Sequence, residues 1–331
     1  MIKKLFFFNI IIFLVIIFSL EAIARIFHLA DLAGISENLI IVDKNIQTNA
    51  PNIEAIAFSK KVFTDKFGFR APNKNFTYNE SNSSVLIIGD SVSFGVGVEE
   101  QNTFVGALRN NFENLNFFNS SVSGYNLKIY PEIVKKNKNL SALTEVIFFL
   151  TLNDLSFEKT VFKENEINQN IKFFNKFKSN RYFVKLNFFL RSKSVFYMWI
   201  KGIISKPSER HFYHMYLMYQ DVSISEKLSK EIMKLKKVTE KNNLKLSIIV
   251  LPYEFQTRVE NCNSYFLKPQ HKIRNTLISL NIKFMDYTEI FCSYEKPSVL
   301  FLKHDPVHLS PEGHMLVFNL LKKDLNYLAN Y

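Results

Sequence analysis

Short apolar runs alternate with amphipathic stretches along most of this chain. The apolar runs are rich in β-branched and aromatic residues, which predicts buried strands, and they cover residues 85–88, 116–120, 145–150, 244–251 and 283–286. Stretches that suit amphipathic helices cover residues 102–112, 130–138, 225–242, 268–280 and 310–328. Because strands alternate with helices, we predict an α/β fold built on a doubly wound parallel sheet.

The chain begins with a basic and then strongly apolar segment. Lys3 and Lys4 precede the run Leu5–Leu20, which is apolar at nearly every position. A membrane-spanning helix needs about 20 such residues, a length that the run reaches with its next few residues. We predict that residues 1–30 form a signal anchor with its amino end inside, so that the rest lies on the periplasmic or extracellular side of the cytoplasmic membrane. A cleaved signal peptide is the alternative, since Ala22-Ile23-Ala24 resembles a cleavage site.

Two segments depart from the alternation of strands and helices. Residues 31–80 show few periodic signals and are predicted to be a stalk that leads into the main domain, residues 81–331. Within the stalk, residues 65–70 suit a packed loop edge or a segment laid near the active site. Residues 155–224 are an aromatic and basic insertion, in which residues 186–204 are predicted to form one helix. Its apolar face either packs on the domain and covers its cleft or contacts a membrane surface.

Composition narrows the class of protein further. The chain has 331 residues, of which 47% are hydrophobic, and a formal net charge of +12. This length suits one large domain with an anchor. The lysines are scattered and no nucleic-acid-binding motif is present, so we expect no nucleic-acid partner. Cys262 and Cys292 are the only cysteines, and in an exported protein such a pair predicts one disulfide, with two unpaired buried thiols as the alternative.

The strand at residues 85–88 ends in Gly89-Asp90-Ser91, a turn of small residues before a helix. Open α/β sheets hold their reactive groups at this carboxyl edge. Asp305 and His308 lie three positions apart on one short loop before the last helix. A serine becomes a nucleophile when a base takes its proton and an acid orients the base. We therefore predict that Ser91 is the nucleophile, His308 the base and Asp305 its partner. An ordinary turn in which Asp90 or Ser91 only caps a helix is the alternative.

A metal site is a second interpretation of the last loop. His304, His308 and His314 are close together in the sequence. However, Pro306 prevents a helical pairing of the first two, and no cysteine or second carboxylate nearby completes a set of ligands. We predict no metal and no cofactor.

Two other loops supply hydrogen-bond donors to the same edge of the predicted sheet. Gly124 follows the strand at residues 116–120, and Asn153 follows the strand at residues 145–150. Acyl transfer from an ester needs donors for the oxygen that becomes negative in the tetrahedral intermediate. The backbone N–H groups of Ser91 and Gly124 and the side-chain amide of Asn153 are the predicted donors. Taken alone, Gly124 and Asn153 are also ordinary turn residues.

Together these blocks resemble those of the SGNH hydrolases, a branch of the GDSL esterases and lipases. The similar blocks are Gly89-Asp90-Ser91 with Gly95, then Gly124, then Asn153-Asp154, and finally Asp305-Pro306-Val307-His308. The resemblance runs from about residue 66 to the final helix, without the insertion. It implies a flavodoxin-like sheet, the catalytic roles given above and an oxyanion hole at Ser91, Gly124 and Asn153. In one departure from the family, Thr151 stands where the third block usually begins with glycine.

Members of this family remove acyl groups from carbohydrates, lipids or small esters, and membrane-anchored relatives act on envelope polysaccharides. The resemblance therefore implies a serine esterase that removes acyl groups, foremost acetyl, from an envelope glycan or another ester. An O-acyltransferase with the same residues is one alternative. A non-catalytic glycan-binding or assembly protein is another, against which the intact set of Ser91, Asn153, Asp305 and His308 argues. Fold alone does not decide among these activities.

Overall fold

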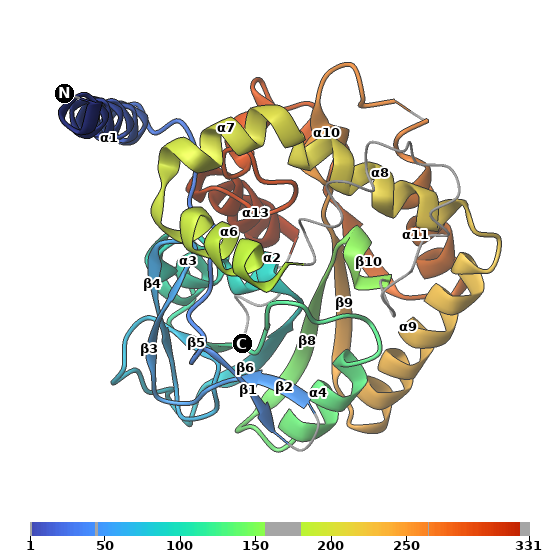
Figure 1. The fold of residues 1–331 in the computed structure, drawn as a ribbon. Helices are drawn as coiled ribbons and strands as arrows, with labels where there is room; N and C mark the ends of the chain where they lie inside the picture. The colour runs from blue at the N-terminus through green and yellow to red at the C-terminus, as the bar shows by residue number, and fades with distance from the viewer. Residues whose placement is uncertain (1, 44–45, 156–179, 264, 325–331) are drawn as a thin grey trace.

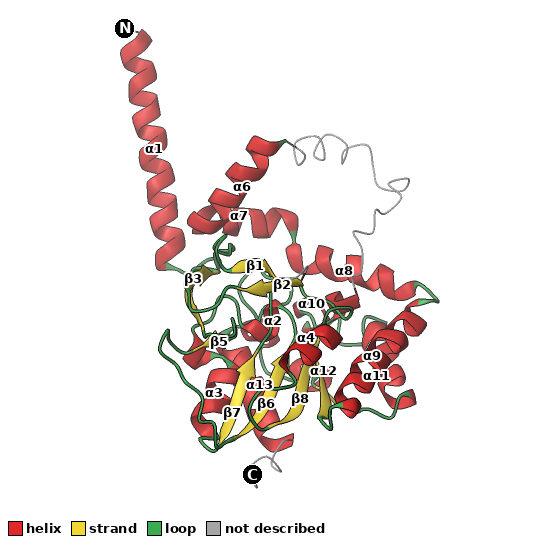
Figure 2. Ribbon diagram, turned by 90° about the horizontal axis from the view of Figure 1, so that it is seen from below, coloured by secondary structure: helices red, strands yellow, loops and turns green. Residues whose placement is uncertain are grey.

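The protein is described from a computed structural model, which describes residues 2–43, 46–155, 180–263 and 265–324. The helix α1, Ile2–Ile26, projects from the rest of the molecule (Figures 1 and 2). Its part Lys3–Ile26 has a mean hydropathy of 2.6 over its most apolar window and is long enough to cross a membrane. The apolar side chains along it are exposed rather than packed in a core, as a lipid-facing helix requires.

Parallel strands form the centre of the sheet, in the order β10-β9-β8-β6-β7. Their bounds are Ser83–Ile88 for β6, Leu115–Asn119 for β7, Leu143–Leu150 for β8, Lys245–Val250 for β9 and Lys283–Asp286 for β10. The first of these strands along the chain lies between the second and the third, which is the flavodoxin-like order. The predicted α/β fold and parallel sheet are therefore confirmed. The strand order reverses between β6 and β8, where such sheets open a crevice for a ligand.

Three further strands extend this sheet beyond β7. They are β3, Glu54–Ala57, β4, Lys60–Thr64, and β5, Arg70–Ala71. Each pairs antiparallel with its neighbour, and β5 joins β7 at Arg70 opposite Asn119. The strands β1, Ile40–Asp43, and β2, Ile46–Asn49, form a separate hairpin. Residues 31–80 are thus not the separate stalk that the sequence predicted, because their strands complete the sheet.

Helices cover both faces of the sheet (Figure 1). On one face, α3, Phe104–Asn111, packs against α13, Pro311–Asp324. On the other face, α9, Ile224–Lys241, packs against both α4, Tyr130–Asn137, and α11, Lys268–Ser279. Thr103 caps α3 by accepting a hydrogen bond from the Gly106 N–H, so this helix begins after Thr103 and not at residue 102 as predicted.

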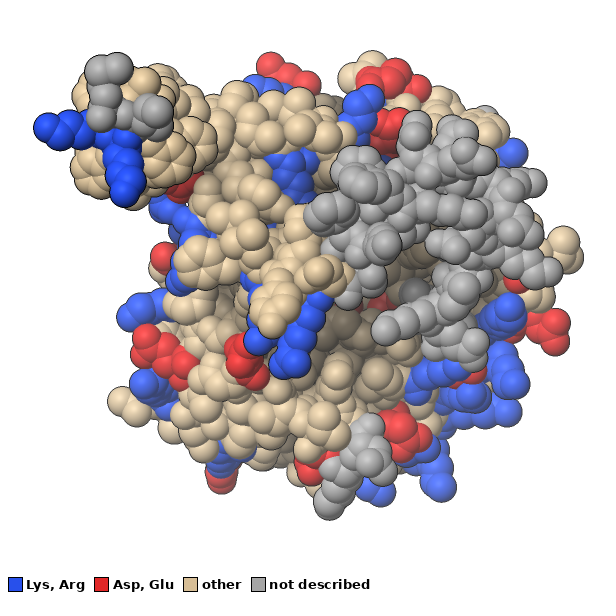
Figure 3. Space-filling view, viewed as in Figure 1, with Lys and Arg blue, Asp and Glu red and all other residues tan. Residues whose placement is uncertain are grey.

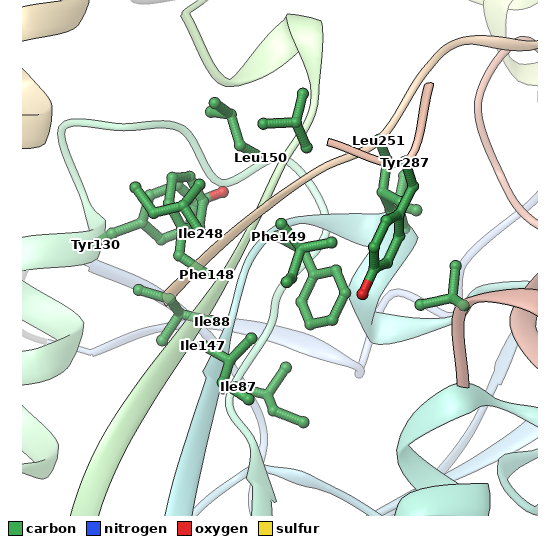
Figure 4. Close-up of a cluster of buried hydrophobic side chains, with 14 of the residues drawn as sticks. Ile87, Ile88, Tyr130, Ile147, Phe148, Phe149, Leu150, Ile248, Leu251 and Tyr287 are labelled. Atoms are coloured by element: carbon green, nitrogen blue, oxygen red, sulfur yellow. The ribbon is translucent and has the colours of Figure 1, made fainter. Parts of the chain in front are cut away.

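The core lies between the sheet and these helices (Figure 4). Ile87, Ile147, Phe148 and Ile248 from neighbouring strands are all fully buried. Both faces of the central strands are covered, which is why they read as unbroken apolar runs in the sequence.

The insertion contains three described helices: α6, Arg181–Lys193, α7, Val195–Ser205, and α8, Pro207–Gln220. The prediction of a single helix over residues 186–204 is wrong, because the helix is interrupted at Ser194. The Ser194 hydroxyl accepts a hydrogen bond from the Tyr197 N–H at 3.0 Å and so begins a new helix. Residues 156–179 of the predicted insertion lie outside the described residues.

Cys262 and Cys292 form the predicted disulfide, with their Cα atoms 6.0 Å apart. The bond joins the turn after α10, Glu254–Thr257, to the end of α12, Thr288–Cys292. It therefore ties together the segments that follow β9 and β10.

Candidate active site

Ser91 lies just beyond the carboxyl end of β6, as the first residue of the short helix α2, Ser91–Phe94. The turn before it is tight, since a Cβ on Gly89 would lie 2.1 Å from the Ser93 Oγ. Asp90 caps α2 by accepting a hydrogen bond from the Val92 N–H at 2.9 Å. The capping role thus falls to Asp90, which leaves the Ser91 hydroxyl available for another partner.

That partner is His308. Its Nε2 lies 2.8 Å from the Ser91 Oγ, and its Nδ1 lies 2.8 Å and 2.9 Å from the two carboxylate oxygens of Asp305. The Asp305 carboxylate also accepts hydrogen bonds from the backbone N–H groups of Val307 and His308, at 2.9 Å and 2.8 Å. The loop thereby holds the carboxylate and turns the imidazole toward Ser91.

The electrostatics of this pair favour a basic imidazole. Burial alone would lower the pKa of His308, but the charge and hydrogen bond of Asp305, with the charge of Asp90, raise it above its ordinary value. For Asp305 the two effects have the opposite signs. Burial alone would raise its pKa, but the charge and hydrogen bonds of His308 lower it below its ordinary value. An imidazole of raised pKa, held beside an ionised carboxylate, is suited to accept a proton from a serine hydroxyl.

The Asn153 side chain is held at both ends of its amide. Its Oδ1 accepts hydrogen bonds from the Thr151 hydroxyl at 2.9 Å and the Tyr253 hydroxyl at 2.7 Å, and its Nδ2 donates to Asp90 at 2.7 Å. Because an ionised carboxylate only accepts hydrogen bonds, Asp90 identifies the end beside it as the nitrogen. Nδ2 carries two hydrogens, of which Asp90 takes one. Thr151, at the family's usual glycine position, thus helps to orient the amide.

The predicted backbone donors lie on the loops that follow β6 and β7. The Ser91 N–H is the first of α2, and a helix leaves such donors without an intrahelical partner. Gly124 has a φ of +87°, and nothing lies within 4 Å of where its Cβ would be. The positive φ explains the glycine, and the open space lets another molecule approach the backbone. The Val122 N–H donates to the Gly89 carbonyl at 3.2 Å, which ties this loop to the turn before Ser91.

Tyr253 and His211 also belong to this candidate site, and neither was predicted from the sequence. Tyr253 follows β9 and is fully buried, and His211 comes from α8 of the insertion. Their rings stack with centroids 5.3 Å apart and planes 7° apart, and His211 Nε2 lies 3.4 Å from the Tyr253 hydroxyl. Burial lowers the pKa of His211 to about 4, so its ring is neutral near pH 7. Tyr253 had a signal, since it closely follows a predicted strand end, whereas His211 had none.

Arg70, from the predicted stalk, supports the chain that follows Ser91. Its guanidinium is fully buried and donates to the carbonyls of Phe94, Gly95 and Val98, each at 2.5 Å. Its Nε lies 3.0 Å from the buried Glu100 carboxylate. Arg70 therefore links residues 65–70 to the chain after Ser91, while the burial of Asp65 and Phe69 also fits the packed loop edge that was the other interpretation.

Phe58 brings the same lead-in segment to the catalytic loop. It lies in the turn between β3 and β4, and its ring meets the His308 ring edge to face with centroids 5.0 Å apart. The aromatic ring shields one side of the imidazole from water.

The three histidines considered as metal ligands do not converge. His308 is engaged by Asp305, His314 is fully buried with its Nδ1 3.4 Å from the Phe104 nitrogen, and His304 packs against Gly202. Within the described residues, no group of three His, Cys, Asp or Glu side chains is placed to hold a metal ion.

Comparisons with known proteins give a likeness in fold. No family model and no curated protein matches the sequence. A lipolytic G-D-S-L family protein from Veillonella parvula DSM 2008 is 14% identical, over 73% of this chain and 97% of that one, with a TM-score of 0.42. The esterase EstA from Pseudoalteromonas sp. is 12% identical, over 76% and 100%, with a TM-score of 0.41. The acetyl xylan esterase AlAXEase is 14% identical, over 73% and 98%, with a TM-score of 0.42. At these identities the likeness assigns no activity to this chain.

Proposed function

We propose that this protein is a membrane-anchored serine esterase that removes an acyl group, foremost an acetyl group, from a glycan of the cell envelope. The observation that carries the proposal is the line of hydrogen bonds from the Ser91 Oγ through His308 to Asp305, with 2.8 Å at each step. Ser91 and His308 are 217 positions apart in the sequence. A turn that only caps a helix has no need of this contact, whereas a nucleophile with its base requires it.

The reaction proceeds in two acyl transfers. The Ser91 Oγ forms a bond to the ester carbonyl carbon while its proton passes to His308 Nε2. His308 then returns that proton to the alcohol oxygen as the ester C–O bond breaks, which leaves an acyl group on Ser91. Water repeats the sequence through the same base, releasing the carboxylic acid and restoring the serine. Asp305 stabilises the imidazolium that forms in each half and remains ionised throughout.

The negative oxygen of each tetrahedral intermediate is stabilised by three donors. We assign them to the N–H of Ser91, the N–H of Gly124 and the second Nδ2 hydrogen of Asn153. Asp90, Thr151 and Tyr253 fix the Asn153 amide before substrate arrives, so its dipole is not reoriented during the reaction.

The envelope location rests on α1 remaining attached as an anchor. Ala24 is fully buried in a cluster with Val195, and the Glu21 carboxylate accepts hydrogen bonds from three donors at the start of α7. Cleavage after Ala24 would remove these contacts. The carboxyl-terminal end of α1 is therefore packed as part of the domain. The intact mass of the protein isolated from a membrane fraction should show that residues 1–24 are still present. The glycan substrate follows from the resemblance noted in the sequence.

Labelling with a fluorophosphonate probe tests the assignment of Ser91. The wild-type protein should be labelled on Ser91, and Ser91→Ala should abolish labelling. Ser93→Ala, in the same short helix, is the matched control and should keep it. Equal labelling of folded Ser91→Ala would reject the nucleophile. Release of acetate from an acetyl ester, with and without a glycan acceptor, then separates hydrolysis from acyl transfer.

A further inference from the structure

The helix α6 carries large apolar side chains that face solvent. It contains no buried residue. Among its exposed side chains, Tyr182 is 84% exposed, Leu186 54% and Phe189 57%. A helix in a water-soluble domain normally buries one apolar stripe, so this surface requires an apolar or interfacial environment.

The exposed face also has a definite charge. Asn187 turns toward α7, where its Oδ1 accepts hydrogen bonds from Tyr197 and Lys201 at 2.7 Å and 2.8 Å. At about 100° per residue, Tyr182, Phe189, Lys185 and Lys193 lie on the face of α6 opposite Asn187. Leu186 lies at the edge of that face. The stretch from Arg181 to Ser205 contains lysine and arginine but no aspartate or glutamate. The face is therefore basic as well as apolar and aromatic.

The hairpin formed by α6 and α7 is hydrogen-bonded to the carboxyl-terminal end of α1, at Glu21 and Arg25. The Glu21 carboxylate accepts hydrogen bonds from the Ser194 hydroxyl at 2.7 Å and from the Val195 and Phe196 N–H groups at 3.0 Å each. Arg25 pairs with Glu21 at 2.8 Å and donates to the Lys193 carbonyl at 2.6 Å. Since Glu21 is the first charged residue after the apolar run of α1, these contacts fix the hairpin at the level where α1 leaves the hydrocarbon.

The catalytic edge lies on the same side of the molecule. Figure 2 shows α1 leaving the domain on the side toward which β6, β7 and β8 point. Figure 3 views that side, with α1 nearly end-on, and the surface over α6 and α7 is mostly uncharged with more blue than red around it.

We propose that the α6–α7 hairpin lies in the headgroup region of the membrane that α1 crosses and binds anionic lipid there. The inference rests on the anchor in the proposed function but not on the chemistry of Ser91. Aromatic and aliphatic side chains with flanking lysines are the composition of interfacial helices, and anionic headgroups attract such lysines. A membrane is favoured over a protein partner because the hairpin is fixed beside a helix that enters the bilayer. Docking would hold the carboxyl edge of the sheet toward the lipid surface.

Site-specific labels on the full-length protein in nanodiscs test this placement. The described chain has no free cysteine, so Leu186→Cys can carry a single environment-sensitive fluorophore. Ile278→Cys is the matched control, because it is 61% exposed and lies at the end of α11, near the amino end of β10. Nanodiscs of phosphatidylcholine and phosphatidylglycerol that contain a headgroup-nitroxide lipid should quench most of the emission at position 186 and little at position 278.

A separate set of samples tests whether the lysines of α6 contribute to membrane binding. Lys185→Gln with Lys193→Gln, or omission of phosphatidylglycerol, should reduce quenching at position 186. Equal quenching at positions 186 and 278 would overturn the placement. If neither the lysine substitutions nor the omission of phosphatidylglycerol reduces quenching at position 186, the role of anionic lipid is overturned. If the fluorophore at position 186 reports an apolar environment only when another membrane protein is added, the result would favour a protein partner and reject the proposal. Fluorophosphonate labelling of the same samples reports Ser91 separately, so failure of one proposal is distinguishable from failure of the other.

Discussion

Asn153→Ala should lower kcat by roughly 10²–10³-fold while leaving KM nearly unchanged. The loss corresponds to about 2.7–4 kcal/mol of transition-state stabilisation. Its physical reason is that the Nδ2 hydrogen left free by Asp90 meets a full negative charge only after Ser91 has attacked. The neutral carbonyl of the bound ester gains much less from the same donor, so ground-state binding changes little.

The structure also predicts a separate cost in stability. Without the Asn153 side chain, the buried Tyr253 hydroxyl loses its 2.7 Å acceptor and Asp90 loses its 2.7 Å donor. The Tyr253 hydroxyl keeps only the 3.4 Å contact with His211 Nε2. A buried polar group left without a good partner costs about 1–3 kcal/mol, so the free energy of unfolding should fall by about that amount. Tyr253→Phe is the matched control, because it removes one bond to Asn153 but keeps the amide in place.

Two measurements separate these effects. Steady-state kinetics on a model acetyl ester give kcat and KM, and urea unfolding followed by circular dichroism gives stability. Tyr253→Phe should lose much less turnover than Asn153→Ala. The oxyanion role is refuted if Asn153→Ala raises KM alone, and a direct role of the amide is refuted if both variants lose kcat equally.

Three other outcomes follow from the same site. Ser91→Ala and His308→Ala should each remove nearly all turnover, and the double variant should be little worse than either, because the two act as a unit; additive losses would argue against this. kcat/KM should rise with pH as His308 loses its proton, and because the pKa of His308 is raised, the midpoint should lie above about 6.5; a lower midpoint contradicts the assignment. Arg70→Met should lower the unfolding free energy by about 3–5 kcal/mol, whereas Lys135→Met, which removes an exposed pair with Glu132, should cost less than about 1 kcal/mol; equal losses in urea unfolding would refute the bracing role.

The central strands were predictable because their burial leaves a direct mark on the sequence. Strands β6, β8 and β9 are covered on both faces, so their carboxyl-terminal halves are apolar at every position. The strands β3 to β5 left no such mark, since they are short, partly exposed and joined by a turn with positive φ at Phe58 and Ser59. Their place in the sheet depends on pairing with β7, which lies far along the chain.

The candidate site divides in the same way. Ser91, Asp305 and His308 were predictable because each carries its chemistry on a short local motif. Arg70 and His211 were not, because their roles arise from distant contacts: one with the carbonyls after Ser91, the other with a ring after β9.

The short connection between α1 and the domain sets how far the candidate site can lie from α1. If residues 31–80 were a flexible stalk, its ends would be about 40 Å apart on average, and the distance from α1 to the site would vary over that range. Instead, the Lys303 side chain donates to the His28 carbonyl, and the Lys303 N–H donates to Asp31 at 2.7 Å. The connection to the domain therefore ends within a few residues of α1. If α1 spans the membrane as proposed, the candidate site is held at one fixed height above it. For the glycan substrate proposed above, this fixed height would confine the reaction to the part of the glycan that lies close to the membrane.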